Sequence, residues 1–148
     1  SATGNSSYGY FGGGSGPLSS VDRIDYSNDT ATAIAKGPLS LARVKIAAVG
    51  NSSYGYFAGG YNTPALVSTI DRIDYSNDTA TVTVKGPLFD PNAKRAASGN
   101  SSYGYFASGA AFKTINRVNY ANDTTTAESV GPLTASRYNL AGTNHHPA

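Results

Sequence analysis

The segment Gly50-Asn51-Ser52-Ser53-Tyr54-Gly55-Tyr56-Phe57-Ala58-Gly59-Gly60 decides the fold, because most of it is repeated along the chain. Its first eight residues occur three times, at 4–11, 50–57 and 99–106. A second segment, Asp71–Thr79, is repeated at 22–30 and more loosely at 116–124, and a third, Lys36-Gly37-Pro38-Leu39, returns at 85–88 and, with Val in place of Lys, at 130–133. Three copies of a unit of roughly 45 to 50 residues indicate a repeat protein, in which each unit buries its core against the next.

Turn-forming residues divide each copy into short strands. Gly50-Asn51 favours a tight hairpin, and Ser76-Asn77-Asp78 provides side chains that bond to their own backbone. The second copy is therefore predicted to contain four strands, over Arg43–Val49, Tyr54–Phe57, Thr69–Tyr75 and Thr79–Lys85. The fourth strand alternates Thr and Lys with Ala and Val. This pattern predicts one solvent-exposed face and a position at the outer edge of the unit. The copies differ in length at 61–64 and 90–92, which predicts loops there.

The Tyr-Gly-Tyr-Phe strand is aromatic on both faces. Successive side chains of a strand point to opposite sides, so Tyr54 and Tyr56 lie on one face and Phe57 on the other. A strand of this kind is expected inside, between neighbouring sheets. The residues expected to pack between units are Tyr10, Phe11, Tyr56, Phe57, Tyr105 and Phe106.

Composition narrows the classes of protein. The chain is 39% hydrophobic but only 14% charged, with 17 glycines, and it contains no apolar run of the roughly 20 residues that a membrane helix needs. Its net charge is +2 and its basic residues are scattered, so we expect neither nucleic-acid binding nor membrane insertion. The absence of cysteine excludes disulfides and thiolate metal sites.

Across nearly the whole chain these segments resemble the kelch-type β-propeller repeat. The similar features are an aromatic strand that ends at Gly59-Gly60, the strand Ile70-Asp71-Arg72-Ile73-Asp74, and a Gly-Pro-Leu link into the next first strand. The resemblance implies an all-β fold of three four-stranded antiparallel propeller blades, with the first strand of each blade nearest the central channel. The blades would span about 4–49, 50–98 and 99–144 of a single domain, followed by a tail at 145–148. The chain has no Trp, which the standard fourth strand usually carries, so we describe it as kelch-like.

Three blades are too few to close a ring, because propellers typically have about 4 to 8. We expect two chains to complete a ring of six blades as a homodimer. Ser1–Asn5 matches only the end of a first strand, and Arg137–Gly142 resembles a first strand with no Tyr-Gly-Tyr-Phe after it. The C-terminal strand of each chain is therefore expected to complete the first blade of its partner.

No set of residues predicts a catalytic or metal site. The carboxylates Asp22, Asp25, Asp71 and Asp74 recur from copy to copy, whereas a catalytic pair needs one asymmetric site. We expect the repeated polar residues to pair with Arg23, Arg72 and Arg117, or to bond to nearby backbone. The Asp-x-Ser-x-Asp spacing at 25–29 and 74–78 is interpreted as an Asx-type turn, because it lacks the Gly and distal Glu of a calcium loop. His145-His146 has no further ligand residues, so we expect no metal or cofactor.

Six Asn-x-Ser/Thr sequons occupy equivalent turns, two in each copy. They are interpreted as turn formers rather than as glycan acceptors. Their asparagines are Asn5, Asn28, Asn51, Asn77, Asn100 and Asn122.

The function expected from this pattern is that of a non-enzymatic structural or assembly module. Similar repeats in phage-associated kelch-like proteins imply a virion appendage or another extracellular assembly. The alternative is a lectin-like propeller that binds a carbohydrate or a protein through loop aromatics outside the repeated segments, namely Tyr61, Phe89 and Phe112. A second alternative is an excised or engineered piece of a longer propeller.

Overall fold

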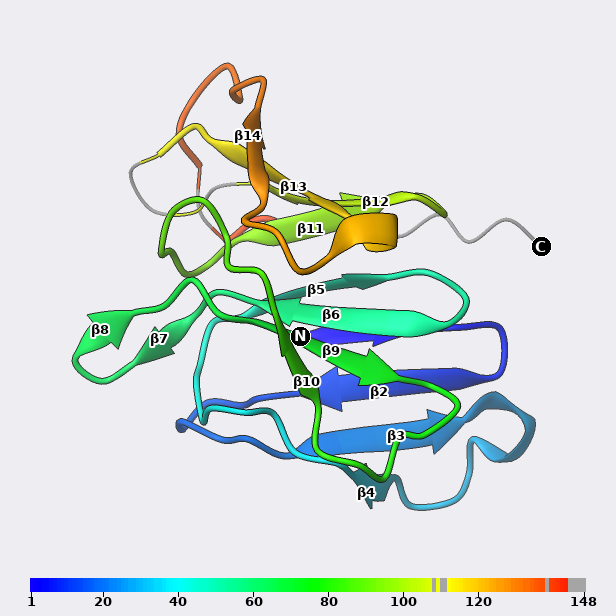
Figure 1. Ribbon diagram of the computed structural model, residues 1–148. Helices are drawn as coiled ribbons and strands as arrows, with labels where there is room; N and C mark the ends of the chain where they lie inside the picture. The colour runs from blue at the N-terminus through cyan, green and yellow to red at the C-terminus, as the bar shows by residue number, and fades with distance from the viewer. Residues whose placement is uncertain (108, 110–111, 138, 144–148) are drawn as a thin grey trace.

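The chain folds into three sheets that follow one another in chain order. The computed structural model describes residues 1–107, 109, 112–137 and 139–143, and within them the chain is all-β with no α-helix. It forms three four-stranded antiparallel sheets and one two-stranded hairpin. Figure 1 shows the three sheets stacked from the N-terminal to the C-terminal copy. The predictions of an all-β fold and of four antiparallel strands in each copy are therefore confirmed.

Each sheet follows the order of its copy in the sequence. The first sheet contains β1 (Ala2–Gly4), β2 (Tyr8–Gly12), β3 (Val21–Asp25) and β4 (Ile34–Lys36). The second contains β5 (Ala47–Gly50), β6 (Tyr54–Ala58), β9 (Ile70–Asp74) and β10 (Thr83–Lys85). The third contains β11 (Ala96–Gly99), β12 (Tyr103–Ala107), β13 (Ile115–Asn119) and β14 (Glu128–Val130). Short 3₁₀ turns, η1 (Tyr26–Asn28) and η2 (Tyr120–Asn122), follow the third strands of the first and third sheets.

The first hairpin of each sheet is closed by an asparagine that bonds to its own turn. In the second sheet, Asn51 Oδ1 accepts hydrogen bonds from the backbone N–H groups of Ser53 and Tyr54, both at 2.9 Å. Asn5 and Asn100 make the same bonds in the other sheets. The side-chain oxygen thus satisfies two turn amides that would otherwise need solvent. These three sequon asparagines act as turn formers, as predicted.

The turn after the third strand is also an Asx turn. Asp25 Oδ1 accepts from the backbone N–H of Ser27, and Asp74 Oδ1 from that of Ser76, both at 2.9 Å. The serine hydroxyls donate to the same oxygens, and the serine bonds hold the pKa of Asp25 and Asp74 below their ordinary values. The prediction of an Asx-type turn at these two residues is confirmed.

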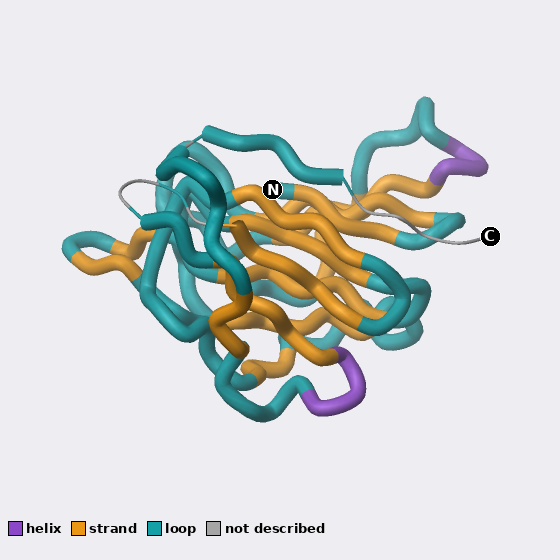
Figure 2. The backbone as a smooth tube through the Cα atoms, turned by 90° about the horizontal axis from the view of Figure 1, so that it is seen from above, coloured by secondary structure: helices purple, strands orange, loops and turns teal. Residues whose placement is uncertain are grey.

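The insertion at 61–64 is part of a hairpin and not a loop. β7 (Tyr61–Asn62) pairs with β8 (Ala65–Leu66), and this hairpin projects from one side of the sheets (Figures 1 and 2). Two backbone hydrogen bonds between Tyr61 and Val44 anchor it to the link between the first two sheets. The prediction of a loop was wrong because four residues of insertion, together with the residues beside them, are enough for two paired strands. The segment 90–92 is a loop, as predicted.

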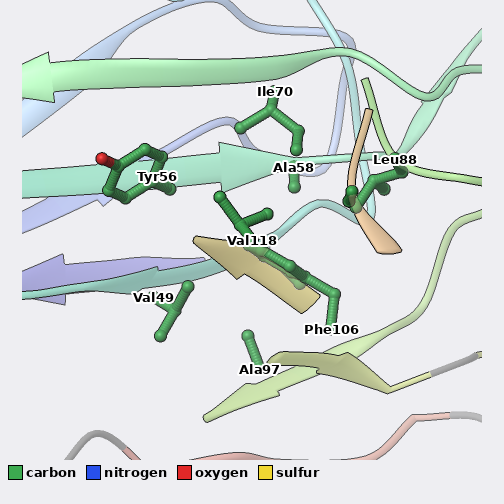
Figure 3. Packing of buried hydrophobic residues seen from close by; sticks show 10 residues of the cluster. Val49, Tyr56, Ala58, Ile70, Leu88, Ala97, Phe106 and Val118 are labelled. Carbon is green, nitrogen blue, oxygen red and sulfur yellow. The ribbon is translucent and has the colours of Figure 1, made fainter. Parts of the chain in front are cut away.

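Apolar side chains fill both spaces between the sheets. One cluster lies between the second and third sheets, where Tyr56, Ala58 and Ile70 face Phe106 and Val118 (Figure 3). The other lies between the first and second sheets and contains Tyr10, Val21, Leu39, Phe57 and Ile73 among its members. The first strands lie side by side, with β5 in contact with both β1 and β11.

The strands are shorter than predicted at both ends of the unit. β5 begins at Ala47 rather than at Arg43, because Lys45 has a φ of 58° that interrupts the extended backbone. β10 begins at Thr83, and the predicted apolar face is correct for Val82, which is buried, but wrong for Val84, which is 55% exposed. The breaks between sheets lie within 37–46 and 86–95, and so precede the repeat boundaries at 49/50 and 98/99.

The expected strand exchange finds no support in the first sheet. That sheet already contains its first strand, β1, which is paired with β2 and is three residues long where β5 has four. The described residues of Arg137–Gly142 form no strand, although a Cβ on Gly142 would meet the backbone of Ala97 in β11. The prediction that the first blade lacks its inner strand was therefore wrong. Residues 144–148, which include His145 and His146, lie outside the described residues.

Candidate functional site

A buried aspartate joins the first sheet to the second. Asp78 Oδ2 accepts hydrogen bonds from Tyr10 Oη and from Arg23 Nη1, each at 2.8 Å. Its other oxygen lies 3.1 Å from Lys36 Nζ. The three donors come from the first sheet and the carboxylate from the second. We call these four residues the Asp78 junction.

The same arrangement joins the second sheet to the third. Asp123 Oδ2 accepts from Tyr56 Oη at 2.9 Å and from Arg72 Nη1 at 2.8 Å, and Lys85 Nζ lies 3.1 Å from Oδ1. These four residues form the Asp123 junction. Because two junctions with the same geometry occur at the same repeat positions, the interaction belongs to the repeat unit.

Ring stacking and a close backbone approach complete each junction. Tyr10 stacks on Tyr75, and Tyr56 on Tyr120, both with ring centroids 4.8 Å apart and planes inclined by 15°. The N–H of Gly37 donates to the Asp78 carbonyl at 2.8 Å. At the second junction, Gly86 donates to Asp123 at 2.9 Å.

Glycine is required at these two positions by space rather than by backbone angle. A Cβ on Gly37 would overlap the carbonyl oxygen of Ala80, and a Cβ on Gly86 would overlap that of Thr125. Neither glycine has a positive φ. The Gly-Pro-Leu segments at 37–39 and 86–88 therefore mark the places where one sheet touches the next.

The Asp78 junction holds an ionised carboxylate away from water. Burial alone would raise the pKa of Asp78, but hydrogen bonds from Tyr10, Lys36 and Arg23 outweigh it, so the pKa lies below its ordinary value. Burial, together with the neighbouring carboxylates, raises the pKa of the Tyr10 and Tyr56 hydroxyls. These tyrosines therefore remain neutral donors at physiological pH.

A second ion pair fixes the link between the first and second sheets. Arg43 Nη2 lies 2.9 Å from Asp71 Oδ2, and both side chains are fully buried. The same nitrogen donates to the carbonyl of Phe57 at 3.0 Å, and Ser40 donates to Asp71 from its backbone and its hydroxyl. In the second link Arg95 pairs instead with Asp90, which also accepts from Asn116.

The ion pairs differ from those predicted within each copy. Arg23 and Arg72 bind Asp78 and Asp123 of the following sheet, and Asp71 binds Arg43 of the preceding link. The predicted pairing is wrong for Asp71, which lies beside Arg72 in β9, so that the two side chains point to opposite faces. The other expectation, a bond to nearby backbone, is confirmed for Asp25 and Asp74. The repetition of Asp at 29, 78 and 123, just after each third strand, was the signal that could have identified the junction acid.

The six residues expected to pack between units have different environments. Tyr10, Tyr56, Phe57 and Phe106 are fully buried in the two clusters between the sheets. Phe11 is 48% exposed and Tyr105 is half-buried, so these two make no comparable packing against the described residues. Both lie on the outer faces of the stack, where no further sheet is present.

Two of the three loop aromatics line one pocket. Tyr61 and Phe112 lie in a shallow pocket of about 160 Å³ beside the β7–β8 hairpin. Lys45 Nζ lies 6.0 Å from the centre of the Tyr61 ring. Phe89 is 61% exposed and lies outside this pocket. The full lining is Lys45, Tyr61, Leu66, Asn92, Ala93, Lys94 and Phe112.

Other kinds of site are not visible in the part of the chain that the structure describes. Within it, no three His, Cys, Asp or Glu side chains gather as a metal site would require. No helix there is long and apolar enough to cross a membrane. No family model and no curated protein matches the chain.

Proposed function

We propose that this protein is a non-enzymatic structural module, a kelch-like propeller segment whose sheets act as blades and whose work is assembly. The observation that carries the proposal is that the buried polar side chains of the junctions hold neighbouring sheets together. Asp78 and Asp123 each accept three donors from the sheet before them, and so each joins two sheets. Such carboxylates have no open position toward a substrate.

The arrangement of the first strands supports a propeller. β1, β5 and β11 lie side by side on one edge of the stack, as inner strands around an axis would. They border, with residues 140–142, a hollow of about 310 Å³. The setting that we propose, a virion appendage or another extracellular assembly, rests on the repeat resemblance alone.

Light scattering tests the assembly function. The outer face of the first sheet exposes the large side chains of Phe11 and Tyr26, of a kind that proteins usually cover. We therefore expect a stable particle whose mass is a multiple of the 15.2 kDa chain, with two copies expected for a ring of six blades. A well-folded particle of 15.2 kDa at every concentration would contradict the proposal.

A second function is favoured by the pocket at Tyr61 and Phe112. Aromatic faces beside lysines suit a carbohydrate ring that carries an acidic group. On a glycan array we expect Tyr61→Ala and Phe112→Ala to abolish any signal of the unchanged chain. Phe89→Ala is the matched control, because this exposed aromatic lies outside the pocket. Equal loss of signal in all three variants would contradict a site in this pocket.

A further inference from the structure

The two outer faces of the stack contain separate halves of the junction that the chain forms twice within itself. In the first sheet, Tyr26 and Asp29 occupy the repeat positions of Tyr75 and Asp78. In the third sheet, Tyr105 and Arg117 occupy the positions of Tyr10 and Arg23. The Asp29 face comprises Phe11, Asp22, Tyr26, Asp29 and Ala33, and the Tyr105 face comprises Tyr105, Arg117, Gly131, Leu133 and Arg137.

The residues of the Asp29 face are exposed where their counterparts are buried. Tyr26 is 50% exposed, whereas Tyr75 is 8% exposed in its stack on Tyr10. Phe11 is exposed and its counterpart Phe57 is fully buried. Asp29 is likewise exposed, and its carboxylate makes no hydrogen bond or ion pair with the residues that the structure describes. This face thus presents an aromatic ring and a carboxylate of the kinds that the junctions bury.

The Tyr105 face has the space and the donors for that carboxylate. A Cβ on Gly131 would have nothing within 4 Å, whereas one on Gly37 or Gly86 would overlap the next sheet. Arg117 lies over the ring of Tyr103 at 4.8 Å, as Arg23 lies over Tyr8 at 4.2 Å.

This face differs from the internal junctions in two respects. Arg117 bonds Glu128 of its own sheet, and Val130 stands where the junctions have lysine. An incoming carboxylate would therefore meet two of the three junction donors, the tyrosine hydroxyl and the guanidinium.

The link after the third sheet contains, at the same repeat position, the arginine of the first link's ion pair. Thr134 and Arg137 follow Gly131-Pro132-Leu133 at the spacing of Ser40 and Arg43 after their own Gly-Pro-Leu. Asn139 has a φ of 57° where Lys45 has 58°, so the backbone turns in the same way two residues after each arginine. The partner of Arg43 is Asp71, and its counterpart on the first sheet is Asp22, which is exposed. Arg137 and Asp22 therefore supply a second complementary pair, independent of Asp29.

We infer that the Asp29 face of one chain docks on the Tyr105 face of a second copy and repeats the Asp78 junction between chains. Asp29 then accepts from Tyr105 and Arg117, Tyr26 stacks on Tyr105, and Asp22 pairs with Arg137. The contact is head-to-tail, and it forms a ring if the rotation closes. This inference rests on the proposed assembly function and specifies its partner and its pairing.

Charge reversal with mixing tests the pairing by light scattering. Asp29→Arg places two cations in the contact, and Arg117→Asp places a new carboxylate beside those of Glu128 and Asp29, so each variant alone is expected to have the mass of one chain. An equimolar mixture restores opposite charges at every contact and is expected to recover the mass of the unchanged assembly. Ser52→Arg, in the exposed hairpin turn of the second sheet, is the control and should assemble normally.

The outcomes separate this inference from the proposed function. An unchanged chain that remains single refutes both. An unchanged chain that assembles, with either reversal variant keeping its mass, refutes only the pairing between these faces. Each variant keeps one unchanged face, and these two faces can still meet in the mixture, so failure of the mixture to assemble also refutes the pairing.

Discussion

At the scale of single residues, one carboxylate carries the contact between two sheets. Asp78 receives a tyrosine hydroxyl, a guanidinium and an ammonium group from the sheet before it. Removal of its charge would leave Arg23 and Lys36 partly desolvated without a counter-charge. The contribution of the junction to the free energy of unfolding is therefore best measured by a substitution of the aspartate rather than of one of its donors.

Asp78→Asn is expected to lower the free energy of unfolding at neutral pH by about 1.5 to 3 kcal/mol, the usual range for hydrogen bonds to charged groups. The pKa of Asp78 in the folded chain lies below its ordinary value. Its stabilising effect is thus complete above an unfolded-state pKa of about 3.9 and is lost as the pH falls through the folded value. Urea unfolding at neutral and acidic pH should show that acidification lowers the free energy of unfolding more in the unchanged chain than in Asp78→Asn. The same acid dependence in both chains would contradict a paired Asp78.

At the scale of elements, the sequence predicts strands well and their partners across sheets poorly. Hairpin turns are local, so Gly50-Asn51 and the Asx turn at Asp74 specify the strand order without knowledge of the rest of the chain. The pairing of Arg23 with Asp78 joins residues of different copies, and several repeated acids compete for it in the sequence. Only the stacking of whole sheets selects among them.

The ends of the strands depend on tertiary contacts in the same way. Lys45 has an αL-type backbone that no local motif demands, and it shortens β5. Val84 is apolar and exposed on an edge strand, so alternation alone gave the wrong face for this residue. The loop pocket was predicted in part, since Tyr61 and Phe112 meet there while Phe89 does not. Its other lining residues lie on three separate segments that only the fold brings together.

At the scale of the whole molecule, the chain is a stack with two unlike ends. Each internal boundary buries an aspartate, stacks two tyrosines and brings a glycine against the next sheet. The Asp29 face and the Tyr105 face hold these parts separately, so like faces do not match and unlike faces do. This asymmetry favours head-to-tail association of chains. The rotation from one sheet to the next determines whether the associated chains close into a ring.

Hydrogen exchange at Gly131, followed by NMR, tests the proposed junction between chains most directly. The amides of Gly37 and Gly86 donate across the internal junctions, and the proposed contact gives Gly131 the same bond to Asp29 of a second chain. At concentrations where the chain is assembled, we expect the Gly131 amide to exchange about as slowly as that of Gly86. Dilution to single chains should then accelerate exchange at Gly131 and leave Gly86 protected. Fast exchange at Gly131 in the assembled particle would contradict a third junction at this face.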